Sequence, residues 1–301
     1  MTDHPPVTEY AANSRLSPET TVGVTPPIAL TIAGFDPSGG AGITADLKTF
    51  AAHRLYGVAC ISALTIQSTQ GVRTIEAISS ETVRRTLECL ADDLQLDGVK
   101  IGMLGTGGVV AEVASFLKRH SESKGANLGR SRVVLDPVLV STSGTALLDS
   151  AGLEILVDEL LASVGWITPN RAELAVLIGS GAVAKNEIPG AARQLQGLAR
   201  RQGNRELNVV VTGGDLEQPD DYLLRADGEE RWLEGTHVKT TSTHGTGCAF
   251  SSALLCSLIA GETPADAART AKTFVAGALR SAYPLGKGKG PPDHFFSLWE
   301  R

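Results

Sequence analysis

The residues that could do chemistry gather first in residues 243–248, Thr-His-Gly-Thr-Gly-Cys, where a loop leads into a helix predicted to begin at Ala249. Gly245 and Gly247 allow backbone N–H groups to point at one spot without interference from Cβ atoms. The helix dipole adds partial positive charge at the same spot. With Thr246 between the two glycines, this loop is predicted to bind an anion. The alternative is an ordinary glycine-containing loop that caps a helix.

Cys248 falls in the first turn of the same predicted helix. A thiol at a helix N-terminus loses its proton more easily than a free thiol. We therefore expect Cys248 to have a lowered pKa. The alternative is that it only packs the start of the helix, as small buried cysteines commonly do.

Strands and helices alternate along the chain. Apolar runs predict buried strands at residues 28–33, 57–66, 98–101, 132–135, 166–168 and 208–211, and residues 237–241 are also β-prone. Helices are predicted at residues 43–52, 81–93, 109–120, 152–161, 171–178, 191–201, 249–260 and 265–281. This order implies an α/β fold with a mostly parallel sheet and helices on both faces. A hairpin pattern between Tyr222 and Leu233 predicts an antiparallel edge.

No repeat, linker or change of composition divides the chain after its N-terminal tail. Residues 1–26 are polar, proline-rich and aperiodic, so we expect a disordered tail. Residues 27–301 are expected to form a single domain.

Polar and glycine residues follow the predicted strands. Ligands of open α/β sheets bind at the carboxyl ends of the strands. The candidates there are Gly34, Gln67, Met103, Asp136, Asn170, Thr212 and Gly213. Each alone is an ordinary turn residue, but together they predict one shared crevice.

Asp136, Asn170 and Glu173 supply oxygen ligands at adjacent strand ends. Asn170 and Glu173 lie one helical turn apart, so both side chains share a face. Such ligands suit Mg²⁺, which keeps several waters and shares phosphate oxygens. The alternative for Asn170 and Glu173 is a helix capping box, which does not exclude the first role.

Other nucleotide-binding motifs fit less well. Residues 40–45 match G-x-G-x-x-A after a strand, which raises a dinucleotide-dependent dehydrogenase as a rival function. That fold also needs an acidic residue at the end of the second strand, and residues 65–69 contain none. A Walker A motif and the protein-kinase motifs are absent from the sequence as well.

The composition and net charge of the chain argue against some classes of binding partner. The net charge of −6 and the pI of about 5.6 give no basic footprint for nucleic acid or anionic membranes. The four cysteines have no metal-site spacing and are expected to be reduced thiols. With neither a long apolar run nor a signal pattern, we expect a soluble, cytoplasmic protein.

Ordered motifs resemble those of the hydroxymethylpyrimidine/phosphomethylpyrimidine kinases, thiamine-biosynthesis enzymes of the ribokinase-like superfamily. They are residues 29–50 (ALTIAGFDPSGGAGITADLKTF), 100–104 (KIGML), 135–138 (LDPV), 167–170 (ITPN) and 244–248 (HGTGC), with the tail at 286–295. The resemblance spans about residues 28–298. It implies a single-domain, three-layer ribokinase-like sandwich.

The resemblance also implies roles for particular residues. Gly34, Asp46, Gln67, Met103 and Val138 would surround the pyrimidine, and Asn170, Thr212 and Gly213 would bind ATP. Asp136 and Glu173, with Asn170, would organise Mg²⁺ and the phosphates. Residues 245–248 would hold the transferring phosphoryl group, with Cys248 at the position of the aspartate base of the superfamily's sugar kinases.

The implied reaction is ATP-dependent phosphorylation of the hydroxymethylpyrimidine and then of its monophosphate, by a homodimer. A dependence on a monovalent cation is left open. Two departures stand out: many relatives have a lysine where this chain has Thr212, and Phe35 replaces a small polar residue. Without that lysine, the negative charge of the ATP phosphates must be neutralised by Mg²⁺, the helix dipole or another lysine.

Two further functions remain as alternatives. The first is a pyridoxal kinase of the same superfamily. Against it, the Gln67 amide offers a donor and an acceptor side by side, which complements an aminopyrimidine edge that pyridoxal lacks. The second is a ligand-sensing relative without catalysis, which the intact loop at residues 245–248 disfavours.

Overall fold

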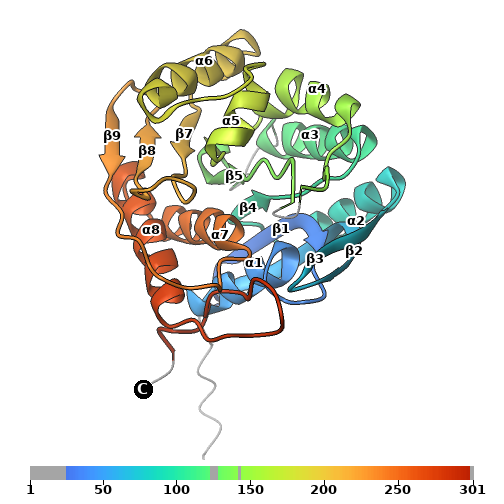
Figure 1. Cartoon of the computed structure of the whole chain (residues 1–301). Coiled ribbons are helices and arrows are strands. Elements are labelled where there is room, and N and C mark those ends of the chain that lie inside the picture. Colours follow the sequence, from blue (N-terminus) through green and yellow to red (C-terminus); the bar gives the residue numbers. More distant parts are fainter. Residues whose placement is uncertain (1–24, 123–127, 142–143, 299–301) are drawn as a thin grey trace, which may run out of the picture.

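The computed structural model describes residues 25–122, 128–141 and 144–298. The predicted disordered tail, residues 1–26, falls almost wholly outside these ranges. Within them, one nine-stranded sheet runs through the molecule in the order β3-β2-β1-β4-β5-β6-β7-β8-β9 (Figure 1).

The central strands are parallel, as predicted. The strands are β1 (Ile28–Phe35), β2 (Tyr56–Ser68), β3 (Gly71–Ala77), β4 (Gly98–Ile101), β5 (Val133–Leu135), β6 (Trp166–Ile167), β7 (Asn208–Val211), β8 (Asp221–Leu224) and β9 (Glu230–Leu233). β1 pairs in parallel with β2 and β4, and the parallel pairing continues through β5, β6 and β7. Strand β1 therefore lies in the interior of the sheet, where its apolar residues are buried on both faces.

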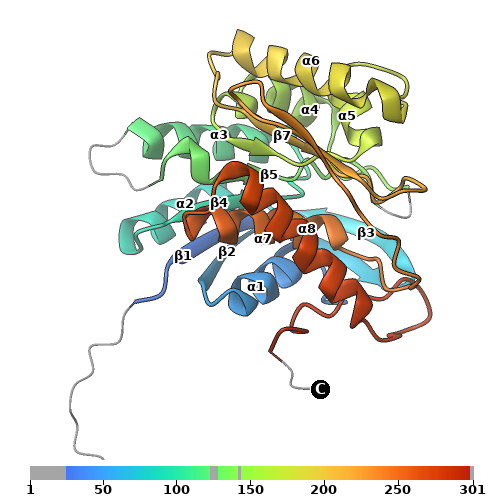
Figure 2. The same cartoon turned by 90° about the vertical axis from the view of Figure 1, so that its left-hand side faces the viewer.

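Eight α-helices cover the two faces of the sheet in the described residues. They are α1 (Gly42–Ala52), α2 (Ser80–Asp93), α3 (Gly107–Glu122), α4 (Ser150–Asp158), α5 (Arg171–Leu177), α6 (Ile188–Arg201), α7 (Thr246–Ile259) and α8 (Pro264–Arg280). One hydrophobic core joins the sheet to residues of α2 through α6, and a second joins it to α1, α7 and α8. The result is the predicted three-layer sandwich. Figures 1 and 2 show it in two views that differ by a 90° turn about the vertical axis.

Both edges of the sheet are antiparallel, whereas the sequence predicted one. The predicted hairpin forms as β8 and β9, with β8 antiparallel to β7. Strand β3 was missed: it pairs antiparallel with β2 at the other edge. Five of its seven residues are polar, small or glycine, so it lacks the apolar run that marked the buried strands.

Three local expectations need correction. Residues 237–241 were expected to be extended strand, but they pair with no strand. Gln67 lies within β2 and not after it, because β2 continues to Ser68. Helix α7 begins at Thr246, three residues before the predicted start. No helix in the described ranges combines the length and apolar character needed to cross a bilayer.

Candidate functional site

The predicted anion loop sits at the start of α7, against the loop that follows β1. Gly245 is the N-cap residue, with a φ of 82° that favours glycine. A Cβ at this position would overlap the carbonyl oxygen of Gly40. Intrahelical bonding begins with the N–H of Ala249 donating to Gly245. The amides of Thr246, Gly247 and Cys248 precede that bond, so helix geometry leaves them available to an anion.

The prediction of a lowered pKa for Cys248 is wrong. Burial raises the pKa of its thiol to about 12, and the nearby Asp136 and Asp46 carboxylates add to this while Lys100 opposes it. Cys248 as a residue is only 9% exposed, so the cost of desolvating a thiolate outweighs the favourable effect of the helix N-terminus. Cys248 is therefore a neutral thiol in the free protein and not a ready base.

An ionic cluster underlies this loop. The Lys100 side chain has no exposed surface, and its Nζ lies 3.0 Å from Asp46 Oδ2 and 3.8 Å from Asp136 Oδ2. Burial alone lowers the pKa of Lys100, but the surrounding Asp46, Cys248 and Asp136 groups raise it above its ordinary value. Lys100 is thus a permanent cation between two carboxylates. Sequence reasoning missed it, although a lysine inside the apolar strand β4 signals a buried partner.

Asp46 serves this cluster and does not face the crevice. Its carboxylate accepts hydrogen bonds from Thr31 (2.6 Å), Ser252 (2.8 Å) and Lys100 (3.0 Å). With 0% of its surface exposed, it cannot touch a bound ligand without rearrangement. We therefore correct its role from substrate contact to internal anchor. Because Asp46 lies on α1, these hydrogen bonds connect α1 to β1, β4 and α7.

Asp136 and Glu173 form a pair of buried carboxyl groups. Burial raises the pKa of Glu173 to about 8, and repulsion from Asp136 adds to this. Burial likewise raises the pKa of Asp136, although Lys100 and Ser251 oppose it. The Ser251 hydroxyl donates to Asp136 at 3.1 Å. Two carboxyls that repel each other suit a divalent cation, which relieves that repulsion.

The described residues contain no cluster of three or more His, Cys, Asp or Glu side chains able to hold a metal. Asp136 and Glu173 could supply part of the coordination shell of a Mg²⁺ ion, whose remaining ligands would be water and substrate phosphate.

The capping-box alternative for Asn170 and Glu173 is confirmed. Asn170 accepts from the Glu173 amide at 2.9 Å, and Glu173 Oε2 accepts from the Asn170 amide at 2.9 Å. Thr212 lies beside Asn170 through a parallel bridge. Gly213 is buried and its N–H donates to Asp221 Oδ1 at 2.9 Å, so that amide already serves the fold. The ATP roles of Asn170, Thr212 and Gly213 stay predictions.

Gly34, Met103 and Val138 come together, as their predicted shared role requires. A Cβ on Gly34 would lie 2.9 Å from the Met103 sulfur, so the glycine makes room for this side chain. Met103 forms a small cluster with Ala63 and Leu147, and Val138 packs against it. This cluster forms an apolar wall suited to an aromatic ring.

Gln67 contacts His244, which in turn contacts Asp36; the sequence motifs included both residues, but no role was predicted for either. His244 Nε2 lies 2.9 Å from the Gln67 amide nitrogen and 2.8 Å from Asp36 Oδ2. Asp36 is 3% exposed. Burial alone raises its pKa, but hydrogen bonds from His244 and Ser38 outweigh it and lower the pKa. The position of His244 directly before the anion loop is the sequence feature that could have indicated this network.

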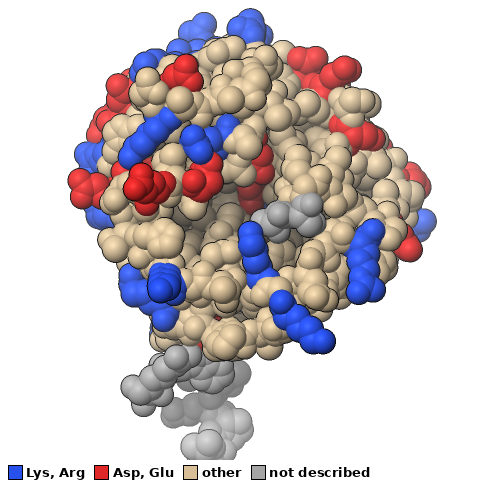
Figure 3. Space-filling view, in the orientation of Figure 1, with Lys and Arg blue, Asp and Glu red and all other residues tan. Residues whose placement is uncertain are grey.

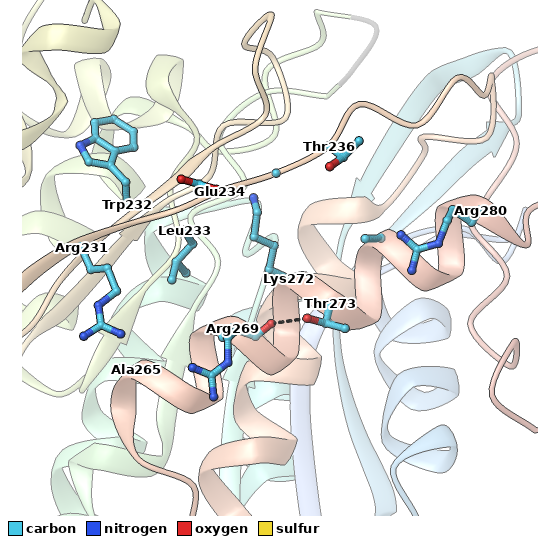
Figure 4. A pocket seen from close by; sticks show the side chains of 12 residues that line it. Arg231, Trp232, Leu233, Glu234, Thr236, Ala265, Arg269, Lys272, Thr273 and Arg280 are labelled. Atoms are coloured by element: carbon cyan, nitrogen blue, oxygen red, sulfur yellow. Dashed lines mark hydrogen bonds between the residues drawn. The ribbon is translucent and has the colours of Figure 1, made fainter.

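The face shown in Figure 3 is hollowed near its middle, with side chains of both charges, Lys or Arg and Asp or Glu, around the hollow. A separate groove of about 440 Å³ lies between β9 and α8 (Figure 4). Its charged lining residues include Arg231, Arg269, Lys272 and Arg280. None of the residues that line it belongs to the strand-end loops described above. Lys272 also forms an ion pair with Asp221 at 2.9 Å, which connects this groove to the Gly213 turn.

Comparison with known proteins identifies the family of this chain. The family described as phosphomethylpyrimidine kinase matches residues 36–293. A hydroxymethylpyrimidine/phosphomethylpyrimidine kinase of Haemophilus influenzae is 38% identical over 271 residues, 88% of this chain and 96% of that protein. A thiamine biosynthesis multifunctional protein of Corynebacterium glutamicum is 40% identical over 273 residues, 89% of this chain but 34% of that protein.

Among solved structures, an ADP complex of Bacillus subtilis pyridoxal kinase is similar to this chain. Its TM-score is 0.79 and its identity 30%, with 91% of this chain and 100% of that chain covered. The extent of the family match, together with the relative of nearly equal length, decides the family. The chain belongs to the phosphomethylpyrimidine kinase family, with a ribokinase-like fold.

Proposed function

We propose that this protein uses ATP to phosphorylate 4-amino-5-hydroxymethyl-2-methylpyrimidine, and then its monophosphate, for thiamine synthesis. The single observation that carries the proposal is the placement of Asp136 beside the first turn of α7. A Cβ on Gly247 would lie 3.9 Å from Asp136 Oδ2, and the Ser251 hydroxyl donates to the same oxygen at 3.1 Å. Glu173 is close enough to Asp136 for the two carboxyl groups to repel each other. The amides at the start of α7 would bind an anion, and the carboxyl groups of Asp136 and Glu173 suit a cation. Phosphoryl transfer needs this arrangement.

The chain's own groups act mainly by position. The amides of Thr246, Gly247 and Cys248 would hold the transferring phosphoryl group at the start of α7. The wall of Gly34, Met103 and Val138 would hold the ring, so that its hydroxymethyl oxygen faces these amides. Phosphoryl transfer through a loose transition state depends on positioning and charge more than on covalent chemistry. A neutral Cys248 thiol is compatible with that demand.

Asp136 and Glu173 would hold Mg²⁺, which would neutralise phosphate charge in the site. Lys100 supplies a fixed positive charge beneath Asp136 and keeps that carboxylate in place. In this proposal the phosphate charge that a lysine at Thr212 would meet falls to Mg²⁺ and to the N-terminus of α7.

The test is a coupled assay of ADP release with the pyrimidine alcohol, its monophosphate and pyridoxal as separate acceptors. We expect turnover with both pyrimidines, and its loss when EDTA removes Mg²⁺. Faster turnover of pyridoxal than of either pyrimidine would replace the proposal by the pyridoxal kinase alternative. ADP release that is the same with and without any acceptor would exclude a kinase for these substrates.

The homodimer belongs to the same proposal, and the assay also tests whether activity depends on a monovalent cation. Sedimentation would give the mass in solution, for which we expect twice the 31.4 kDa of one chain. Replacing K⁺ by tetramethylammonium in the assay would show whether a monovalent cation is needed.

A further inference from the structure

Asp36 organises the loop after β1 through an unusually complete set of donors. Its Oδ1 accepts from the Ser38 amide (2.8 Å) and hydroxyl (2.7 Å). Its Oδ2 accepts from the amides of Gly40 (3.1 Å) and Ala41 (2.9 Å). A carboxyl surrounded by four donors is ionised, and an ionised carboxylate can only accept hydrogen bonds.

The contact between Asp36 and His244 therefore fixes the histidine. At 2.8 Å from Asp36 Oδ2, the His244 Nε2 atom must carry a proton to donate. The His244 side chain is 13% exposed, so water competes little for this bond. The imidazole is held as an Nε2–H donor by a residue 208 positions away in sequence.

That proton decides how Gln67 is oriented. The amide nitrogen of Gln67 lies 2.9 Å from the same Nε2 atom, but two donors cannot bond to each other. The oxygen and nitrogen of an amide are nearly identical in shape, so the surrounding network decides which end faces a partner. With Asp36 ionised, the single Nε2 proton of His244 is shared in a three-centre bond between Asp36 Oδ2 and the Gln67 oxygen, and the Gln67 NH₂ group is directed elsewhere.

We infer that His244 is a positioning residue for substrate specificity, which fixes the Gln67 amide so that the ring is read in one orientation only. This inference rests on the proposed function. The free NH₂ group of Gln67 would donate to a ring nitrogen of the pyrimidine. The oxygen, which has a second lone pair, would accept from the adjacent amino group. A ring that lacks this amino group leaves the oxygen without its second partner.

The test compares the aminopyrimidine alcohol with its analogue that lacks the 4-amino group, in steady-state assays of four variants. These are His244→Leu, Gln67→Leu, the double variant, and His237→Leu as a matched control on an exposed histidine. We expect His244→Leu to raise the KM for the aminopyrimidine about tenfold, as expected for a hydrogen bond left unmade. The KM for the analogue and for ATP, and the value of kcat, should stay within about twofold.

Non-additivity separates positioning from support of the loop. If His244 acts through Gln67, the double variant is no worse than Gln67→Leu alone. Additive losses, or an equal loss with both substrates, would overturn the inference and leave His244 as loop support. If wild-type protein phosphorylates neither pyrimidine, the proposed function fails first, and this inference with it.

A second measurement does not depend on activity. ¹⁵N-edited NMR of wild-type protein reports which ring nitrogen of each histidine carries the proton, and the signals that are missing from the spectrum of His244→Leu are assigned to His244. We expect His244 to be protonated at Nε2 near neutral pH. An unprotonated Nε2 would mean that Gln67 donates to His244, which overturns the inference.

Discussion

At the scale of single residues, Lys100 offers the sharpest test of the cluster beneath the site. Lys100→Met would leave Asp46 and Asp136 without their cation in the interior. Removing one partner of a buried ion pair destabilises by roughly 3–5 kcal/mol, because the other charge stays buried. Urea unfolding should show this loss, and Lys100→Met with Asp46→Asn should recover part of it.

Lys185→Met is the control for that prediction, because Lys185 pairs with Asp220 at 2.9 Å and is 45% exposed. Its loss should change the free energy of unfolding by at most about 1 kcal/mol. If the two lysine variants destabilise equally, Lys100 does not hold the cluster together.

Cys248 gives a second prediction at this scale. Because its pKa is raised to about 12, the thiol stays protonated throughout the neutral range and removes no proton beforehand. Cys248→Ala should therefore lower kcat/KM by a similar factor in both phosphorylations, less than the roughly 10²–10⁴ expected from loss of a general base. Assays with each pyrimidine separately measure this. A much larger loss with the alcohol than with the monophosphate would return the role of base to Cys248.

The two corrected residues show where sequence reasoning ended. The sequence places Cys248 at a helix start, which favours a thiolate, but it does not reveal the desolvation that favours the thiol. The sequence places Asp46 close to the predicted substrate loop, but it does not reveal that Asp46 lies on the buried face of α1. Both depend on tertiary burial, whereas the capping box at Asn170 depends only on local spacing and was foreseen.

At the scale of elements, the α7 N-terminus depends on a single glycine. Gly245→Ala would force an alanine into a left-handed conformation and drive its Cβ into the Gly40 carbonyl. We expect the loop to shift and kcat/KM to fall at least about 100-fold, because small displacements of catalytic groups have effects of that size.

Gly261→Ala is the matched control for Gly245→Ala. Gly261 also has a positive φ, 85°, but an added Cβ would meet no atom within 4 Å. It should lose about 1 kcal/mol of stability to strain while kcat/KM is kept. Equal kinetic losses in the two variants would show that strain alone, and not the contact with Gly40, disrupts the protein.

Elements with strong patterns were predicted well, and weakly patterned ones were not. The apolar run of β1 and the hairpin of β8 and β9 follow from burial on both faces and from turn residues. Strand β3 has no such pattern, since it is an edge strand with exposed residues. The register shift between Ile66 and Gln67 likewise follows from pairing with β3, which periodicity does not encode.

At the scale of the whole molecule, the C-terminal segment joins distant parts of the site. The N–H of His244 donates to Gly290, and the Gly288 amide donates to Thr69 beside β2. The amide of Asp293 donates to the end of α8 at Ala278. The segment therefore connects the anion loop, β2 and α8, so its packing bears on the stability of the entire fold.

His294 makes this segment sensitive to acid. It is 3% exposed, and within the described residues its Nε2 has no hydrogen-bond partner. Burial lowers the pKa of His294 to about 4, and the nearby Lys48 adds to this. Because the folded pKa lies below the unfolded value of about 6.5, the unfolded chain takes up the proton first. The stability from a neutral His294 is complete above about pH 6.5 and is lost as the pH falls from there toward 4.

We therefore predict that wild-type protein loses about 2 kcal/mol of unfolding free energy between pH 7 and pH 5 through His294 alone. Other groups titrate in the same range, so the measurement is a difference between wild type and His294→Gln in urea titrations at both pH values. The variant should be less stable than wild type at pH 7, where a well-packed neutral imidazole is replaced, and should lose much less stability on acidification. The surface change His237→Gln should leave the pH dependence as in wild type. If wild type and His294→Gln lose the same free energy between pH 7 and pH 5, His294 is not the group that couples acid to unfolding.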